Sequence, residues 1–130
     1  MFQILIAEDD KNTRKLMEAV LKCNGFNPIP ASSGEEALKL LDRHHIDLAV
    51  LDIMMPGMDG YELTRHLRSM DYNLPILMVT AKVLPEDKRK GFMAGTDDYM
   101  TKPVDEEEMV LRIRALLRRA QIASERKITI

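Results

Sequence analysis

The chain has 130 residues, of which 45% are hydrophobic and 31% are charged, and its formal net charge is −2. This length predicts a single domain, and the small negative charge excludes attraction of the whole chain to nucleic acid or to an anionic membrane. No apolar run approaches the about 20 residues of a membrane span, and the N-terminus lacks a signal-peptide pattern, so we expect a soluble, cytoplasmic protein with no membrane partner.

The first predicted strand covers residues 3–7 and ends at three consecutive acids, residues 8–10. A helix follows, for which Asn12 or Thr13 is the candidate N-cap. Its apolar positions recur at helical spacing, at Leu16, Val20 and Cys23. Cys23 is the only cysteine, which excludes an internal disulfide, and its position on this stripe favours a buried, inert thiol.

The second predicted strand, residues 26–31, contains Pro28 and Pro30. Because proline cannot donate a hydrogen bond to a neighbouring strand, we expect this strand at an edge of the sheet. Ser33 and Glu36 have the spacing of a capping box and indicate the start of the next helix. The inner face of that helix is predicted to contain Ala37, Leu38 and Leu41.

The central predicted strand is expected to be buried on both faces, because residues 48–51 are all apolar. It places Asp52 at its C-terminal end, directly before a loop with a Pro56–Gly57 turn. A helix over about residues 61–70 and a fourth apolar strand over residues 74–80 follow.

The last third of the chain is predicted to hold a helix from Pro85 to about Ala94, a short strand within residues 97–103, and a helix over about residues 105–120. Five strand–helix units without repeats imply a parallel sheet with helices on both faces. Right-handed crossovers and the edge position of the second strand favour an α/β, flavodoxin-like, doubly wound fold with strand order 2-1-3-4-5.

Polar side chains collect at the C-terminal ends of four predicted strands: Glu8, Asp9, Asp52, Thr80 and Lys102. Because these ends open onto one crevice of a doubly wound sheet, we expect the five side chains to converge. Crowded carboxylates repel one another unless a cation neutralises them, and all-oxygen ligation suits Mg²⁺. A nucleophilic carboxylate, a metal, a hydroxyl donor and a lysine are together the parts that phosphoryl transfer needs.

Each of these residues also has a plain structural explanation. The acids at residues 8–10 could be solvated at a helix start, and Asp52 could cap the turn that follows it. Thr80 could be a buried strand residue, and Lys102 could be a surface charge. Their shared position at strand ends favours chemistry over these separate explanations.

Four motifs, in order along the chain, resemble those of one family. They are ILIAEDD at residues 4–10, LDIMMPGMDG at residues 51–60, VTAK at residues 79–82 and GTDDYMTKP at residues 95–103. The chain resembles a response-regulator receiver domain of bacterial two-component signalling, and the resemblance covers residues 3–120. Small departures are Val104, where the family often has an aromatic residue, and Thr96, where it usually has alanine.

The resemblance implies a role for each residue of the acidic group. Asp52 is the expected phospho-acceptor, Asp9 the direct ligand of Mg²⁺ (or Mn²⁺), and Glu8 the second acid of the pair. The backbone carbonyl of Met54 is expected to complete the protein ligands. Asp10 is the alternative ligand if the alignment shifts by one residue.

The resemblance also implies a switch. The hydroxyl of Thr80 is expected to move toward the phosphoryl group, with Lys102 paired to it and the ring of Tyr99 moving inward. The bond between Lys102 and Pro103 is expected to be cis. The positions two residues beyond Asp52 and Thr80 are Met54 and Lys82. Because Met54 offers no polar group to orient a water, we expect slow autodephosphorylation and a phosphorylated state lasting minutes or longer.

The charges of the fourth helix, fifth strand and fifth helix resemble those of the OmpR/PhoB subfamily, whose receivers dimerise through this face. The resemblance implies a homodimer in which three pairs cross a two-fold axis over an apolar patch. The pairs are Lys88 with Glu108, Asp98 with Arg112, and Asp97 with Arg119. The alternative is a solvated charged face.

The resemblance divides the chain into a receiver domain at residues 1–120 and a linker at residues 121–130. Subfamily members carry a winged-helix DNA-binding domain after such a linker, and residues 127–130 could open its first strand. We expect this chain to be part of such a transcription regulator, with a stand-alone receiver as the alternative. DNA contact is expected only through a domain absent from these residues.

The expected function is a phosphorylation-activated signalling switch, a phosphoprotein rather than an enzyme, which self-phosphorylates in the presence of magnesium. A sensor histidine kinase is the expected phosphoryl donor, and kinase choice is expected to depend on residues 13–21. A hydrolytic phosphatase is a competing class, but such enzymes place a second catalytic acid where this chain has Met54. An unphosphorylated interaction module is a third class, disfavoured because the acids, Thr80 and Lys102 are all present.

Overall fold

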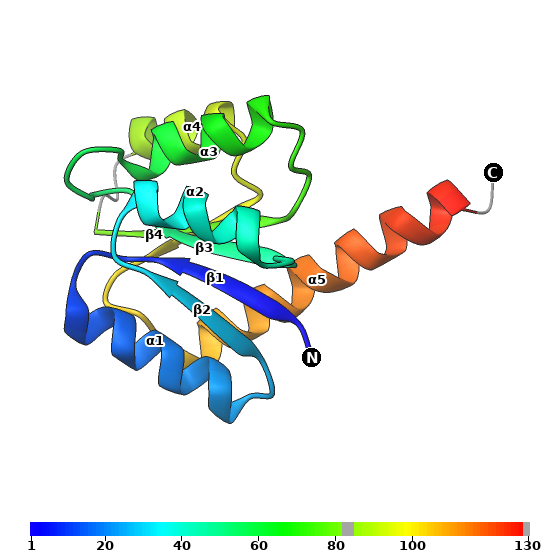
Figure 1. Cartoon of the computed structure of the whole chain (residues 1–130), viewed down its shortest axis with the longest axis horizontal. Coiled ribbons are helices and arrows are strands. Elements are labelled where there is room, and N and C mark those ends of the chain that lie inside the picture. Colours follow the sequence, from blue (N-terminus) through cyan, green and yellow to red (C-terminus); the bar gives the residue numbers. More distant parts are fainter. Residues whose placement is uncertain (82–84, 129–130) are drawn as a thin grey trace.

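The computed structural model describes residues 1–81 and 85–128, with side chains as far as residue 123. Five strands alternate with five helices along the described chain (Figure 1). The strands are β1 Gln3–Ala7, β2 Asn27–Ala31, β3 Leu48–Asp52, β4 Ile76–Thr80 and β5 Asp98–Thr101. The helices are α1 Lys11–Cys23, α2 Gly34–Arg43, α3 Gly60–Ser69, α4 Pro85–Ala94 and α5 Glu106–Ile128. No helix among the described residues is long and apolar enough to cross a membrane.

The strands form one parallel sheet in the order β2-β1-β3-β4-β5, which confirms the predicted flavodoxin-like α/β fold. Helices α1 and α5 cover one face of the sheet, and α2, α3 and α4 lie on the other (Figure 1). Side chains alternate between the two faces. Ile4 and Ile6 pack with α1 and α5, whereas Leu5 and Ala7 pack with α2 and α3. Each central strand is therefore buried on both sides, as its apolar sequence predicted.

Strand β2 lies at the edge of the sheet, as its prolines predicted, because it pairs only with β1. The capping box at the start of α2 is also present. The hydroxyl of Ser33 accepts from the backbone N–H of Glu36 at 3.1 Å, and the Glu36 carboxylate accepts from the N–H of Ser32 at 3.0 Å. The first bond satisfies an N–H group in the first turn of α2, and the second holds Ser32, the residue just before the N-cap.

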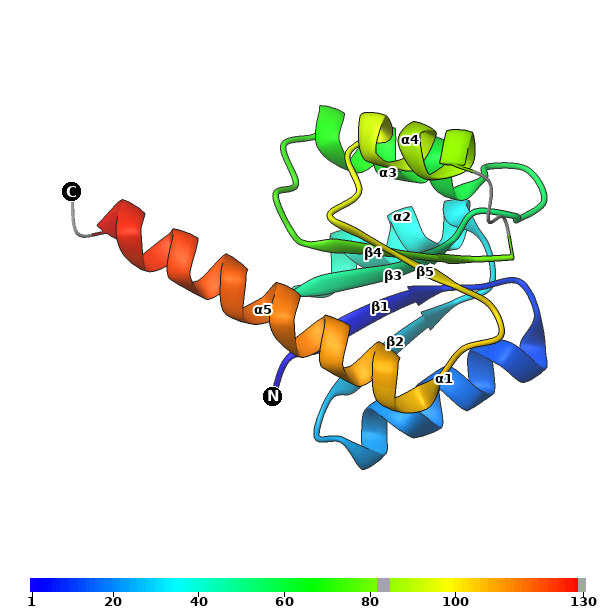
Figure 2. The same ribbon diagram turned by 180° about the vertical axis from the view of Figure 1, so that it is seen from behind.

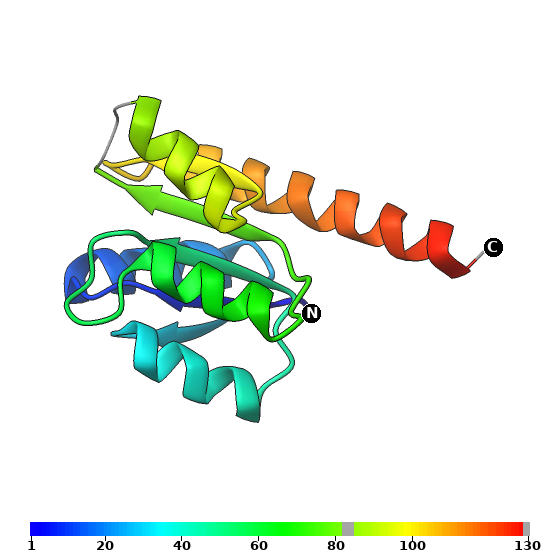
Figure 3. The ribbon, with the colours of Figure 1, turned by 90° about the horizontal axis from the view of Figure 1, so that it is seen from above.

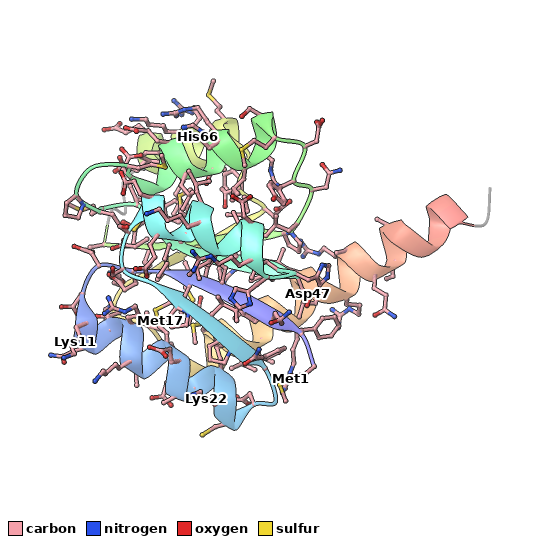
Figure 4. All side chains as sticks on the ribbon, in the orientation of Figure 1. Met1, Lys11, Met17, Lys22, Asp47 and His66 are labelled. Atoms are coloured by element: carbon pink, nitrogen blue, oxygen red, sulfur yellow. The ribbon has the colours of Figure 1, made fainter. Side chains whose placement is uncertain are left out.

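The predicted cap of α1 is wrong, and of its predicted apolar stripe only Val20 is buried. Asp10 is the N-cap, because its carboxylate accepts from the Thr13 backbone N–H at 2.9 Å and from the Thr13 hydroxyl at 2.6 Å. The buried residues are Met17, Val20 and Leu21, so Leu16 is 43% exposed and Cys23 is exposed rather than buried. Figure 4 shows Met17 on the sheet side of α1, with Lys11 and Lys22 pointing away from it. A helix turns about 100° per residue, so Leu16 and Cys23, seven residues apart, fall on the same border of the buried stripe.

Helix α5 extends further than predicted. The sequence analysis ended it near Ala120, but it continues to Ile128, and its last turns project beyond the sheet (Figures 2 and 3). Residues 121–128 of the predicted linker are therefore helical, whereas residues 129–130 lie outside the described part. The stretch contains good helix formers and neither glycine nor proline, so no local signal ends the helix at Ala120.

At the N-terminal edge of the sheet, Arg68 connects four elements, and we call this group the Arg68 clasp. Its guanidinium donates to the backbone carbonyls of Gly95, Tyr72 and Leu74 at 2.8–3.1 Å and pairs with the Asp97 carboxylate at 2.8 Å. The same oxygen of Asp97 accepts from the backbone N–H of Ile76 at 2.8 Å. The clasp thus connects the end of α3 to the end of α4 and to the starts of β4 and β5.

Candidate functional site

Three acids meet at the C-terminal ends of β1 and β3. Glu8, Asp9 and Asp52 each offer a carboxylate oxygen, and these oxygens lie within 4.8 Å of one another. Glu8 and Asp52 are buried, whereas Asp9 is exposed. Because β1 and β3 are neighbours in the sheet, residues 8, 9 and 52 come together despite their separation in sequence.

Lys102 lies between two of these acids. Its Nζ is 2.6 Å from Glu8 Oε1 and 3.2 Å from Asp52 Oδ2. Its backbone N–H donates to the carbonyl of Thr80 at 2.8 Å, which holds the residue next to the end of β4. The following peptide bond, to Pro103, is cis, as predicted.

Burial and ion pairing act in opposite directions on this lysine and its acids. Burial raises the pKa of Glu8 above its usual range, although the hydrogen bond from Lys102 opposes this effect. Burial alone would lower the pKa of Lys102, but the hydrogen bond to Glu8 and the charge of Asp52 outweigh it, so the pKa is raised. Lys102 is therefore a cation at neutral pH, paired with two buried carboxylates.

The loop between β3 and α3 fixes the Asp52 carboxylate. Asp52 Oδ1 accepts from the backbone N–H of Met54 at 3.3 Å, and the carbonyl of Ile53 accepts from the N–H groups of Met55 and Gly60. A Cβ at Gly60 would lie 2.5 Å from the Asp52 carbonyl oxygen, so only glycine permits this close approach. The Met54 side chain is 57% exposed.

Thr80 and Tyr99 lie on the side of the site that faces α4. Thr80 is buried at the end of β4, and Tyr99 is buried in a small cluster with Ile53, Tyr61 and other apolar residues. The Tyr99 ring is thus directed inward in this structure. Lys82, the position two residues beyond Thr80, lies outside the described residues.

Tyr61 is a residue that the sequence analysis did not single out. Its hydroxyl donates to the backbone carbonyl of Asp87 at 3.0 Å and shares a hydrogen bond with the hydroxyl of Tyr99. Burial raises the pKa of both tyrosines. The ammonium of Lys90 lies 4.6 Å from the centre of the Tyr61 ring. Tyr61 directly follows Gly60, so it connects the Asp52 loop to α4.

The six residues assigned to the dimer face lie on α4, β5 and α5 or next to them, and several pair within the chain. Arg112 binds both carboxylate oxygens of Asp98 at 3.0 Å and the carboxylate of Glu108 at 2.8 Å. Asp97 pairs with Arg68 in the clasp. Within the described residues, neither Lys88 nor Arg119 forms an ion pair with a carboxylate. The charges of Asp98 and Arg112 are therefore already compensated in one chain.

The acidic group fits a hard divalent cation. Mg²⁺ prefers carboxylate and carbonyl oxygens and keeps several waters, and an exposed Asp9 beside two buried acids leaves room for them. Asp10, the alternative ligand, is engaged as the cap of α1. The hydrogen bonds from the hydroxyl and then the backbone of Thr13 lower its pKa. The geometry thus favours Asp9 over Asp10 as the ligand.

The fold and the acidic crevice define a phospho-acceptor domain, and comparison with known proteins agrees. Residues 4–114 match the model of the response regulator receiver domain. The chain belongs to this family, whose members act as phospho-acceptor switches in two-component signalling. Membership implies a cognate histidine kinase. Membership of this family favours the phospho-acceptor switch over the hydrolytic phosphatase that the sequence analysis considered as an alternative.

The chain is also similar to individual relatives and to solved structures. The chain is 43% identical over its full 130 residues to the heme response regulator HssR of Staphylococcus aureus, of which it spans 58%. A solved Francisella response regulator 1452 receiver domain has a TM-score of 0.88 at 34% identity, covering 92% of this chain and 99% of that one. The chemotaxis protein CheY4 of Vibrio cholerae has a TM-score of 0.86 at 28% identity, covering 89% and 98% of the two chains.

Proposed function

We propose that Asp52 accepts a phosphoryl group from a sensor histidine kinase and that the chain is the receiver of a transcription regulator. The observation that carries the proposal is the placement of the Asp52 carboxylate. It lies at the end of a fully buried strand, bonded to Lys102 and to the Met54 N–H, within 4.8 Å of Glu8 and Asp9.

The chemistry follows from these contacts. An Asp52 carboxylate oxygen attacks phosphorus of a phosphohistidine, a P–O bond forms, and the P–N bond breaks as the imidazole leaves and takes up a proton. Lys102 is close enough to Asp52 to donate to a phosphoryl oxygen where negative charge accumulates. Glu8, Asp9 and the carbonyl of Met54 would hold Mg²⁺ or Mn²⁺ together with Asp52. The metal, when bound, neutralises charge on the phosphoryl oxygens.

Incubation with Mg²⁺ and acetyl phosphate, followed by intact mass measurement, tests the acceptor. We expect a gain of one phosphoryl mass in the parent chain and none in Asp52→Asn. Asp42→Asn, which removes an exposed acid on α2, is the control and should be phosphorylated normally. Absence of any gain in a folded protein would support an unphosphorylated interaction module and refute the proposal.

The switch residues extend the proposal from acceptance to output. The Thr80 hydroxyl would move toward the phosphoryl group, and the Tyr99 ring would move with it. This movement would transmit the change to the face formed by α4, β5 and α5. The exposed Met54 side chain offers no polar atom to an attacking water. We therefore expect a phosphorylated half-life of minutes or longer, and a half-life of seconds in a phosphate-release assay would contradict this.

The same face is the proposed dimer interface. Exposed apolar side chains on α4 and α5 supply the apolar patch: Phe92, Met93 and Leu111. Because Arg112 is paired within the chain, Lys88→Glu combined with Arg119→Glu is the sharper test of charges between chains. We expect this variant to dimerise more weakly than the parent chain in light scattering after phosphorylation. A dimer of unchanged affinity would refute the assignment.

The proposed effector is a winged-helix DNA-binding domain that follows residues 1–130, in a cytoplasmic regulator. The resemblance to the OmpR/PhoB subfamily supports this part, as does the match to HssR, a longer response regulator. In a full-length protein, phosphorylation should tighten operator binding in an electrophoretic mobility assay, and Asp52→Asn should abolish the gain. Equal binding by both proteins would contradict the proposed coupling.

A further inference from the structure

The first turn of α2 is in close contact with the loop between β3 and α3. A Cβ at Gly34 would lie 2.9 Å from Met58 Cβ and 3.0 Å from the Met58 carbonyl oxygen, so the two backbones approach closely. Next to this contact, Glu35 Oε1 accepts from the backbone N–H of Met58 at 3.2 Å. The same oxygen lies 3.0 Å from the position of a Cβ on Gly57. We call this group the α2–loop contact.

The remainder of the loop is fixed at its base. The Ile53 carbonyl accepts from the Gly60 N–H at 3.0 Å, which closes the two limbs of the loop. Asp59 caps α3 through the Glu62 N–H at 2.9 Å, and the Met55 side chain is buried in the core. The limb at Gly57 and Met58 lies outside these anchors, and Gly57 turns the chain there with a φ of 75°. Glu35 supplies the hydrogen bond from α2 to this limb.

The other limb carries Met54, whose N–H donates to the nucleophilic carboxylate of Asp52. Three residues separate Met54 from Met58 in a loop whose two ends are joined by the bond from the Gly60 N–H to the Ile53 carbonyl, so the position of Met58 constrains that of Met54. We propose that Glu35 is a positioning residue for phosphoryl transfer: by holding Met58, it sets the position at which Met54 presents its backbone carbonyl to a divalent cation. This inference rests on the proposed function, in which that carbonyl is a metal ligand.

The inference assigns α2 a role beyond covering the sheet. Glu35 is exposed, so a partner that engages its carboxylate would release Met58 and change the site without touching Asp52. The effect acts through a hydrogen bond and not through the charge of Glu35. A glutamine at this position keeps the accepting oxygen and loses the charge, so it separates the two explanations.

The test compares Glu35→Ala, Glu35→Gln and the control Asp42→Asn, whose carboxylate is also exposed on α2. The first readout is the hydrogen exchange rate of the Met58 amide in metal-free protein. The second is the Mg²⁺ dissociation constant measured by calorimetry. Loss of one partly exposed hydrogen bond predicts Met58 exchange that is about fivefold faster and Mg²⁺ binding that is about threefold weaker in Glu35→Ala. Glu35→Gln and Asp42→Asn should match the parent chain.

Three results would overturn the inference. They are unchanged Met58 exchange in Glu35→Ala, faster exchange with unchanged Mg²⁺ affinity, and a Glu35→Gln variant as weak as Glu35→Ala. Phosphoryl uptake by Asp52→Asn, measured in parallel, tests the proposed function separately. If that variant still takes up a phosphoryl group, the acceptor assignment fails while the exchange and Mg²⁺ results still decide the role of Glu35.

Discussion

Replacing Arg68 by alanine should destabilise the protein more than the same replacement at Arg65, the other arginine of α3. The side chain is 24% exposed, and its guanidinium donates to three backbone carbonyls as well as to Asp97. Each hydrogen bond from a charged donor is worth about 1 kcal/mol net when water can partly replace it. The pair with the half-exposed Asp97 adds little. We therefore expect a loss of about 3 kcal/mol in the free energy of unfolding.

Urea denaturation followed by circular dichroism measures this loss, and in a thermal scan it should lower the midpoint by about 10 °C. Arg65→Ala, an exposed arginine of the same helix, is the matched control and should change stability by less than about 0.5 kcal/mol. Arg68→Lys keeps the charge, but an ammonium cannot span the carbonyls of Gly95 and Leu74, so we expect a loss close to that of alanine. A loss below about 1 kcal/mol for Arg68→Ala, or full rescue by lysine, would refute the view that the directed bonds of the clasp stabilise the fold.

Four further changes test other contacts. Lys102→Ala leaves Glu8 and Asp52 without their cation, so it should cost about 2 kcal/mol in metal-free buffer, and Mg²⁺ should restore much of this loss in a thermal shift assay. Gly60→Ala places a Cβ 2.5 Å from the Asp52 carbonyl oxygen and should cost about 2 kcal/mol in urea denaturation, while slowing phosphorylation by acetyl phosphate. Tyr61→Phe removes the bond to the Asp87 carbonyl, and we expect a loss of about 1 kcal/mol in the free energy of unfolding with faster amide exchange in α4; unchanged exchange there would mean that this bond does not hold α4 to the Asp52 loop. Gly34→Ala pushes against Met58 and should weaken Mg²⁺ binding in calorimetry, whereas unaltered binding would mean that the loop yields without moving Met54.

The strand order and the convergence of the acidic group could be predicted because both follow from local patterns. An apolar strand that ends in a polar residue places that residue at the C-terminal edge of a parallel sheet, whichever helices cover it. The proline-rich β2 is at the edge for an equally local reason, since its missing N–H groups exclude a central position. These features need no knowledge of which side chains touch.

The features that the sequence analysis predicted wrongly or missed depend on contacts between distant parts of the chain. Two phases of the α1 stripe satisfy helical spacing, and only packing against α5 and the sheet selects the one that buries Met17 and exposes Cys23. The clasp of Arg68 joins residues 27 and 29 positions apart, so no local spacing signals it. Arg112 binds Glu108 on its own helix and Asp98 of β5, and the pairing with Asp98, 14 positions away, depends on how α5 lies on β5.

The contact between Tyr61 and Tyr99 has a spectroscopic consequence. The chain contains three tyrosines and no tryptophan, so its near-ultraviolet absorbance and intrinsic fluorescence come mainly from three phenol rings. Two of these rings share a hydrogen bond and lie between the Asp52 loop and α4. A rearrangement of that region changes the polarity around both chromophores at once. The unlabelled protein therefore carries its own optical reporter at the junction between the acidic crevice and α4.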